Sequence, residues 1–227
     1  VDEAGLKTLE AEIGASNCFS GIMDVADGKS VQKGVDAFAD KTKGELNVLL
    51  NNAGILKFGL FENVQLKDPL RIVDVNLKGC LRCIYYCLTY LKKTTDARII
   101  NMSSISSIYG APELSVYAST KHALSAMTEA LDIELEPHGI VVCDIKPPYV
   151  KTPMLKGGEN SKSLKILRFI GGQTNAKKIA KTVWKAANKN KLHWKIGFTR
   201  LMAFHCWFLP FTVRFAVKLM AMPRIKK

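Results

Sequence analysis

The segment RIINMSSISSIYGAPELSVYASTK, Arg98 to Lys121, predicts a strand, then a loop, then the start of a helix. Its first residues, with Ile99 and Ile100, form a short apolar run of the kind found in parallel strands buried on both faces. A serine cluster and a loop with glycine and proline follow, and the helix then carries Tyr117 and Lys121. The segment therefore places several polar side chains at the carboxyl end of a buried strand.

Strands and helices alternate along the chain on both sides of this segment. The predicted strands are Cys18–Val25, Leu46–Leu50, the strand that starts at Arg98, and Ile140–Ile145. The predicted helices are Asp2–Glu12, a helix through Val31, Val35 and Phe38, Pro69–Lys93, the helix of Tyr117, and Ala176–Asn188. Strict alternation requires a parallel sheet, because each right-handed crossover needs the length of a helix. We therefore predict an α/β fold, a doubly wound parallel sheet with helices on both faces.

Length, charge and hydropathy fit one folded domain. The chain of 227 residues can build a single α/β core, and its mean hydropathy is +0.05. The net charge of +13 comes from the region after Val150, where Lys and Arg are frequent and acidic residues are scarce. A nucleic-acid-binding protein would carry basic and aromatic residues within a recognisable module, which this sequence lacks. No nucleic-acid partner is predicted.

The six cysteines lie mostly in apolar segments, which favours free thiols in a cytoplasmic compartment. Cys80, Cys83 and Cys87 share one face of a predicted helix, but no histidine or fourth ligand lies near them. They therefore predict helix packing, and no metal site is expected. No apolar run is long enough to span a bilayer.

The predicted strands end in residues suited to binding or chemistry. These ends are Asp24, the turn Asn51-Asn52-Ala53-Gly54, the pair Ser103-Ser104, and the pair Pro147-Pro148. In a doubly wound sheet, ligands bind beyond the carboxyl ends of the strands. Asparagine and glycine also form tight turns that leave backbone N–H groups free to meet a ligand. The sequence therefore predicts one binding site at this edge of the sheet.

Tyr117 and Lys121 are four residues apart on a helix, so they share a face. An adjacent ammonium stabilises a phenolate, so Lys121 is predicted to lower the pKa of Tyr117 from its ordinary value. Tyr117 could then exchange a proton with an alcohol or carbonyl oxygen, and Ser104 could orient the same oxygen by a hydrogen bond. Taken alone, the pair could equally be an ordinary surface pair of a helix.

The order of the motifs gives the pair its context. Asn51-Asn52-Ala53-Gly54 follows one strand, Asn76 lies in the next helix, Asn101-Met102-Ser103-Ser104 follows the next strand, and Tyr117-Ala118-Ser119-Thr120-Lys121 comes last. In this order and context the chain resembles the short-chain dehydrogenase/reductase family over nearly its whole length. The resemblance implies a Rossmann-type domain and NAD- or NADP-dependent hydride transfer between an alcohol and a carbonyl.

The resemblance also implies roles for individual residues. Tyr117 would be the acid/base, Ser104 would orient the substrate oxygen, Lys121 would lower the tyrosine pKa and bind the ribose, and Asn76 would hold a proton-relay water. The implied cofactor-binding residues are Asp24, Val25, Asn52, Ala53, Gly54, Tyr117, Lys121, Pro147 and Thr152. The family also implies a homodimer or homotetramer.

Two features depart from the family pattern. Pro148 stands where the family usually has glycine, and it lacks an N–H that could contact the nicotinamide. No glycine-rich turn for the pyrophosphate occurs near the start of the sequence. We therefore expect an N-terminally truncated enzyme without the first strand-helix-strand, whose 227 residues alone bind NAD(P) poorly. The residue that selects NAD or NADP would lie in that missing part.

The C-terminal region divides the chain into two predicted parts, an incomplete catalytic domain over 1–192 and a hydrophobic, basic extension over 193–227. From Trp194 to Met222 aromatic residues are interspersed with Arg and Lys, a composition that suits an amphipathic helix at a membrane interface. Packing on the sheet or on a second subunit would explain the same pattern. A membrane contact would favour a hydrophobic alcohol or ketone as substrate. The competing function is a non-catalytic scaffold of the same fold that binds a membrane or partner through this tail.

Overall fold

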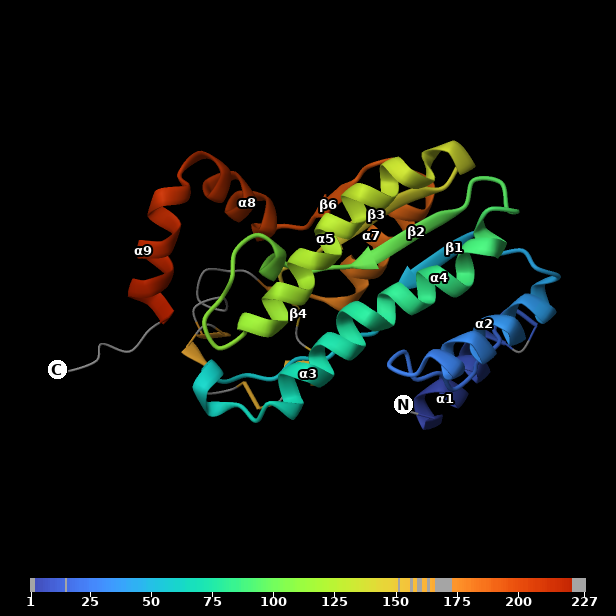
Figure 1. Cartoon of the computed structure of the whole chain (residues 1–227), viewed down its shortest axis with the longest axis horizontal. Coiled ribbons are helices and arrows are strands. Elements are labelled where there is room, and N and C mark those ends of the chain that lie inside the picture. The colour runs from blue at the N-terminus through green and yellow to red at the C-terminus, as the bar shows by residue number, and fades with distance from the viewer. Residues whose placement is uncertain are drawn as a thin grey trace.

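The main sheet has four parallel strands in the order β1-β2-β3-β6 (Figure 1). The computed structural model describes residues 3–14, 16–150, 152–155, 157–158, 161–162, 164–165 and 173–221. The strands are β1 (Val48–Asn51), β2 (Arg98–Met102), β3 (Val141–Lys146) and β6 (His193–Lys195). Leu50 is in register with Ile100, and Ile100 with Cys143, so the carboxyl ends of β1, β2 and β3 lie side by side.

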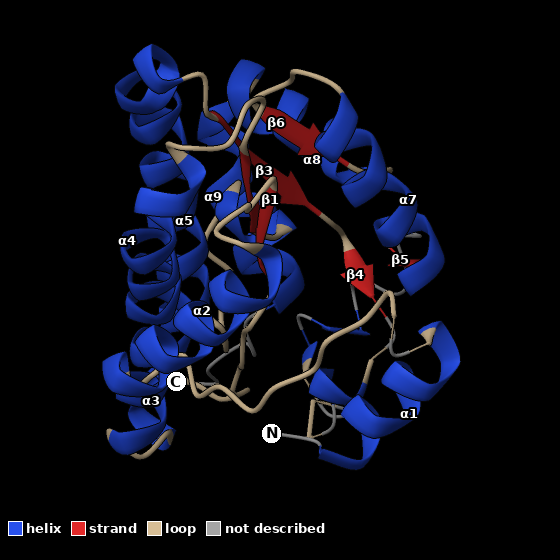
Figure 2. Ribbon diagram, turned by 90° about the vertical axis from the view of Figure 1, so that its right-hand side faces the viewer, coloured by secondary structure: helices blue, strands red, loops and turns tan. Residues whose placement is uncertain are grey.

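Helices cover both faces of this sheet, as Figure 2 shows. The helices are α1 (Glu3–Ile13), α2 (Gly28–Thr42), α3 (Lys67–Val73), α4 (Gly79–Leu91), α5 (Ser115–Leu135), α7 (Ala176–Asn188), α8 (Phe198–Phe208) and α9 (Pro210–Ala221). Ile99 and Val142 face a core formed with α2, α4 and α5, whereas Ile100, Cys143 and Ile145 face a second core formed with α7. The strands are thus buried on both faces, which confirms the predicted doubly wound α/β fold.

Local signals explain where several helices begin and end. The Asp27 side chain caps α2 by accepting from the N–H of Lys29 at 3.0 Å, and Lys43 ends α2 in a left-handed conformation. Asn175 caps α7 by accepting from the N–H of Lys178 at 2.9 Å. The predicted helix Pro69–Lys93 is present as α3 and α4, which are joined by a π-helical turn over Asp74–Lys78.

The three cysteines of α4 point into the core. Cys80, Cys83 and Cys87 are 4–6% exposed and pack with residues of α2, β2 and β3. In the described part of the chain, no group of histidine, cysteine and carboxylate side chains is arranged to hold a metal ion. The prediction that these cysteines serve helix packing is confirmed.

The predicted strand Cys18–Val25 is wrong. Residues 18–24 run as an irregular segment, and β1 is the edge strand of the described sheet. A strand needs a hydrogen-bonded neighbour, and this segment lies beside no strand in the described chain. Val25 instead packs against α4, where a Cβ added to Gly79 would lie 2.8 Å from Val25 Cγ2.

The C-terminal part begins inside the sheet. β6 pairs with β3, so residues 193–195, which the sequence placed in the extension, are part of the main sheet. A second small ladder, β4 (Tyr149–Val150) with β5 (Gln173–Thr174), was not predicted either. Helices α8 and α9 lie at the end of the molecule opposite to α1 and α2 (Figure 1). No helix among the described residues is long and apolar enough to cross a membrane.

Candidate active site

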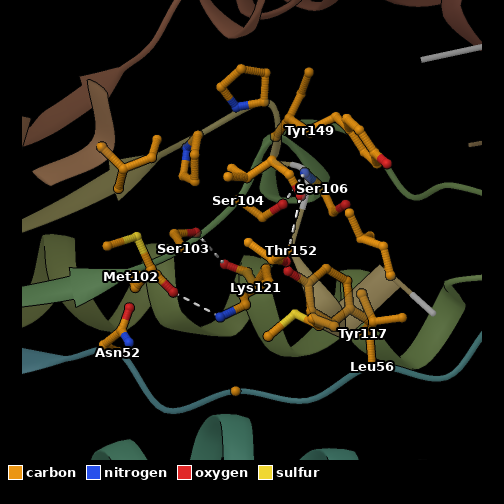
Figure 3. Close-up of a pocket in the computed structure, with 18 of the residues that line it drawn as sticks. Asn52, Leu56, Met102, Ser103, Ser104, Ser106, Tyr117, Lys121, Tyr149 and Thr152 are labelled. Atoms are coloured by element: carbon orange, nitrogen blue, oxygen red, sulfur yellow. Dashed lines mark hydrogen bonds between the residues drawn. The ribbon is translucent and has the colours of Figure 1, made fainter. Parts of the chain in front are cut away.

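A cavity of about 630 Å³ opens at the carboxyl ends of β1, β2 and β3. The predicted site residues that line it are Asn52, Gly54, Ser104, Tyr117, Lys121, Pro147 and Thr152. Figure 3 shows that Ser104, Tyr117 and Lys121 lie around the same opening although they come from a loop and a helix. The cavity therefore lies at the edge of the sheet where the sequence predicts the binding site.

Ser104 is held in position by the turn that follows β2. It is the N-cap of the 3₁₀ turn Ile105–Ser107, and its Oγ accepts from the N–H of Ser106 at 3.1 Å. The Ser107 hydroxyl donates to the carbonyl oxygen of Ser104 at 2.7 Å. The side chain is 8% exposed, so its hydroxyl has little freedom apart from the side open to the cavity.

Tyr117 lies in the first turn of α5, and its hydroxyl group hydrogen bonds with the side chain of Ser104. Burial raises the pKa of Tyr117 above its ordinary value, and the bond to Ser104 opposes this rise. The predicted direction, a pKa lowered by Lys121, is therefore wrong for this structure. Nζ of Lys121 lies 5.6 Å from the centre of the tyrosine ring, and burial dominates. Tyr117 is thus protonated at neutral pH.

Lys121 is a buried cation with a fixed orientation. The residue is 4% exposed, and its Nζ donates to the carbonyl oxygen of Met102 at 2.7 Å (Figure 3). Its own carbonyl oxygen accepts from the Ser103 hydroxyl at 3.2 Å, so β2 holds both ends of the residue. Burial lowers the pKa of Lys121 to about 8.

Asn76 lies behind the cavity, in the π-helical turn between α3 and α4. Its Oδ1 accepts from the N–H of Ile55 at 2.8 Å, and its Nδ2 donates to the carbonyl oxygen of Ile55 at 2.9 Å. The side chain is 1% exposed and does not line the cavity. Asn76 therefore holds the loop that follows β1, and in particular the backbone next to Gly54.

Replacement of Asn76 by Ala will lower the free energy of unfolding by about 2 kcal/mol, because the backbone N–H and C=O of Ile55 lose their partners. Chemical denaturation monitored by circular dichroism measures this change. Asn63→Ala, at an exposed position of the turn Phe61–Asn63, is the matched control and should change stability little. Equal effects of the two substitutions would show that Asn76 does not hold the loop.

Gly54 lies close to the lysine. A Cβ added to Gly54 would lie 3.5 Å from Oδ1 of Asn76 and 3.8 Å from Nζ of Lys121. Asn52 lines the cavity on the same loop, whereas Ala53 does not. The loop with Asn52 and Gly54 therefore forms one wall of the cavity, which the Lys121 side chain also lines.

Asp24 and Val25 lie away from this cavity. The Asp24 carboxylate accepts from the N–H of Ala26 at 2.9 Å and pairs with Arg71 at 3.1 Å. The Ala26 bond and the Arg71 bond lower the pKa of this carboxyl. The carbonyl oxygen of Val25 accepts from Arg82 at 3.2 Å. The structure thus brings three of the predicted catalytic residues, Ser104, Tyr117 and Lys121, to one cavity, whereas Asn76 lies behind it and the two predicted adenine contacts lie away from it.

The sequence did not identify the apolar walls of the cavity. These walls include Leu56, Phe58, Leu114, Leu155, Leu164, Ile179 and Val183. They come from loops and from α7, and nothing in their spacing distinguishes them from other apolar residues. A Cβ added to Gly158 would clash with the ring of Phe58, so this ring would have to shift if a larger residue replaced Gly158.

A comparison with protein-family models matches residues 2–162 to the short chain dehydrogenase family. The chain belongs to this family. Its members are NAD(P)-dependent oxidoreductases, and the fold and the arrangement of Ser104, Tyr117 and Lys121 are those that the sequence resemblance implied.

Individual relatives are more distant. A 3-alpha-(or 20-beta)-hydroxysteroid dehydrogenase of Mycobacterium bovis is 42% identical over 111 residues, which cover 49% of this chain and 43% of the relative. A 3-ketoacyl-(acyl-carrier-protein) reductase from Brucella melitensis, complexed with NADH, superposes with a TM-score of 0.75 and 25% identity over 86% of this chain and 83% of that chain. ElxO with NADP bound superposes with a TM-score of 0.73 and 25% identity over 86% and 84%. The match to the hydroxysteroid dehydrogenase thus spans about half of each chain.

The residues around the cavity fit the nicotinamide end of a dinucleotide. Gly54 and Lys121 line the same cavity, and a glycine backbone near a buried cation suits a ribose with its hydroxyl groups. The predicted contact for the adenine end of the dinucleotide fits less well, because the Asp24 carboxylate already bonds to the N–H of Ala26 and pairs with Arg71.

Proposed function

We propose that this protein is an NAD(P)-dependent oxidoreductase that interconverts an alcohol and a carbonyl by hydride transfer, with a hydrophobic substrate. The observation that carries the proposal is the convergence of Ser104, Tyr117 and Lys121 on one largely apolar cavity. A protonated hydroxyl, a second hydroxyl bonded to it, and a nearby cation are the groups that proton transfer to a carbonyl oxygen requires.

Each of the three residues has a distinct task in the proposed reaction. Tyr117 donates its proton to the carbonyl oxygen during reduction and removes one from the alcohol during oxidation. Ser104 donates a hydrogen bond to the same oxygen and so holds it near Tyr117. Lys121 binds the ribose and supplies positive charge that stabilises the tyrosinate once the proton has left. The bound nicotinamide supplies or accepts the hydride.

The cofactor would lie along the loop after β1. Asn52 and Gly54 would contact it on one side, and Pro147 and Thr152 on the other, since all four line the cavity. Pro148 also lines the cavity and offers only a carbonyl group, so a backbone N–H at this position takes no part.

A hydrophobic substrate is favoured by the cavity walls. Phe58, Leu114 and Leu164 line the same cavity as the catalytic hydroxyls, and Leu114 and Leu164 are 7% and 3% exposed. An apolar wall with few polar groups selects ligands by shape and apolar area. The matched hydroxysteroid dehydrogenase supports the same class of substrate. Steady-state kinetics of the full-length protein with cyclic and long-chain ketones test this proposal, and a preference for small polar carbonyls would contradict it.

The rate of carbonyl reduction will fall as the pH rises through about 8, because Lys121 loses its proton there. Below this pH the ammonium is present and the rate will be nearly constant, since Tyr117 remains protonated as well. A profile of kcat/KM against pH measures the midpoint. In Lys121→Arg the guanidinium stays charged, so the midpoint should move up or disappear. An unchanged midpoint in that variant would assign the titration to another group.

We further propose a homodimer or homotetramer in a cytoplasmic setting. Leu81 and Tyr85 on α4 and Ile133 on α5 are 46%, 75% and 72% exposed, which suits a contact between subunits. All six cysteines are free, which favours a reducing compartment. The competing proposal is a non-catalytic scaffold that binds a membrane or partner through its tail. A full-length protein without turnover on any carbonyl, but with membrane binding, would favour the scaffold.

A further inference from the structure

The outer surface of helices α8 and α9 is apolar. The large apolar residues exposed there are Leu201 (63%), Phe204 (60%), Trp207 (77%), Phe208 (53%), Phe211 (76%) and Phe215 (69%). A surface helix of a globular protein normally turns its apolar face to the core and its polar face to water. Here both helices expose apolar side chains, so this surface is suited to contact with an apolar phase.

The two helices form an ordered hairpin. Thr212 on α9 and His205 on α8 are joined by a hydrogen bond of 3.0 Å. The ring of Phe208 lies 4.3 Å from the ring of Phe204 and 4.6 Å from that of Trp207, centre to centre. The inner faces of the helices are buried, since Thr199 and Val213 are 0% and 4% exposed. The aromatic side chains therefore form a fixed ridge.

The positive charge of the α8–α9 region indicates which class of partner it contacts. Arg200, Arg214 and Lys218 are exposed on the same two helices. The 68 residues after Glu159 contain sixteen Lys and Arg and no Asp or Glu. A second copy of this chain would bring equal positive charges together, which opposes self-association through this face. A nucleic acid would need the basic residues at the centre of the face, where apolar residues lie instead.

We propose that the α8–α9 hairpin is an interfacial anchor for anionic lipid bilayers. Trp207, Phe211 and Phe215 would enter the boundary between headgroups and acyl chains, while Arg214 and Lys218 would contact anionic headgroups. The hairpin lies on the surface of the bilayer, because no described helix is suited to span it. This anchor goes beyond the proposed reaction and does not depend on it.

Sedimentation with vesicles tests the anchor. The intact protein should bind vesicles of phosphatidylcholine with about 30% phosphatidylserine at least tenfold more tightly than vesicles of phosphatidylcholine alone, and added salt should weaken this binding. Trp207→Ser/Phe211→Ser/Phe215→Ser should reduce binding to the anionic vesicles at least tenfold. Arg214→Gln/Lys218→Gln should reduce the preference for anionic lipid. The matched control is Trp184→Ser, because Trp184 on α7 is 73% exposed but lies outside the hairpin.

Fluorescence gives a second readout that a loss of folding would not imitate. Tryptophan emission of the intact protein should shift to shorter wavelength on addition of anionic vesicles, and Trp207→Phe should remove most of the shift while keeping most of the binding. Unchanged binding by the triple serine variant, with its circular dichroism retained, would overturn the proposal. So would binding that is equal on neutral and anionic vesicles, or a dimer in light scattering that only the triple variant abolishes.

Discussion

Replacement of Tyr117 by Phe will lower the turnover number of the full-length protein by about 10²–10⁴-fold, the usual contribution of a positioned acid or base. The substitution removes the only group that is proposed to transfer a proton to the substrate. It also removes the hydrogen-bond partner of Ser104, but it leaves the ring and its packing in place. Stopped-flow or steady-state absorbance of the reduced nicotinamide at saturating substrate measures the effect.

The matched control is Tyr90→Phe. Tyr90 lies on α4 outside the cavity, and its hydroxyl bonds only weakly to Asp36, at 3.5 Å, so removing this hydroxyl should not affect turnover. Tyr117→Phe should also keep its affinity for the cofactor within a few-fold, since Lys121 and Gly54 remain. Undiminished turnover of every substrate by Tyr117→Phe would contradict the proposed mechanism.

Replacement of Asp144 by Ala will lower the free energy of unfolding by about 3–5 kcal/mol, because it leaves a buried cation without its partner. Asp144 lies in β3 and its side chain is fully buried. Its Oδ2 lies 3.4 Å from Nζ of Lys146 and accepts from the Ser125 hydroxyl at 2.6 Å, and its Oδ1 lies 2.9 Å from Nδ1 of His193. The Lys146 side chain is only 6% exposed.

A second substitution, at Lys146, tests whether the unpaired lysine causes the loss of stability. Asp144→Ala/Lys146→Met removes the unpaired charge and should recover about half of the lost stability, because an apolar side chain tolerates burial. Asp68→Ala breaks an exposed pair with Lys57 and should change stability by less than about 1 kcal/mol. Urea denaturation of the four proteins measures all of these values. A double variant less stable than Asp144→Ala would show that the unpaired lysine is not the cause.

Much of the fold was predictable because burial on both faces leaves long apolar runs. β1, β2 and β3 lie within one or two residues of the predicted strands, and Ala176–Asn188 is α7 with the predicted bounds. The site was predictable in part for a related reason. Parallel strands bring their carboxyl ends together, so Ser104 and the helix that follows it had to lie near the turn at Asn52.

The structural features that the sequence did not predict depend on contacts between distant segments of the chain. Cys18–Val25 has the composition of a strand, yet a strand forms only beside another strand. β6 has three residues and only one of them is strongly apolar, so its pattern is too short to detect. Asp144 and Lys146 lie within an apolar run, so the sequence does not show that they pair with each other. The contact of Asp144 with His193 depends on the pairing of β3 with β6.

The direction of the Tyr117 pKa shift could also be determined only from the structure. The sequence shows that a lysine follows on the same helical face, but it does not show how deeply either group is buried. In the folded chain, burial outweighs the attraction between them, and it affects Lys121 as well. Tyr117 therefore holds the proton that it is proposed to donate to a carbonyl oxygen.

The most direct test of the proposed reaction is the transfer of deuterium from C4-deuterated NADH or NADPH to a hydrophobic ketone by the full-length protein. Mass spectrometry should show one deuterium on the carbinol carbon of the alcohol that the wild-type protein forms from the C4-dideuterated cofactor, and about 10²–10⁴-fold less of this labelled alcohol with Tyr117→Phe in the same time. An alcohol that carries no deuterium, or equal amounts of labelled alcohol from the wild-type protein and Tyr117→Phe, would contradict hydride transfer at this site.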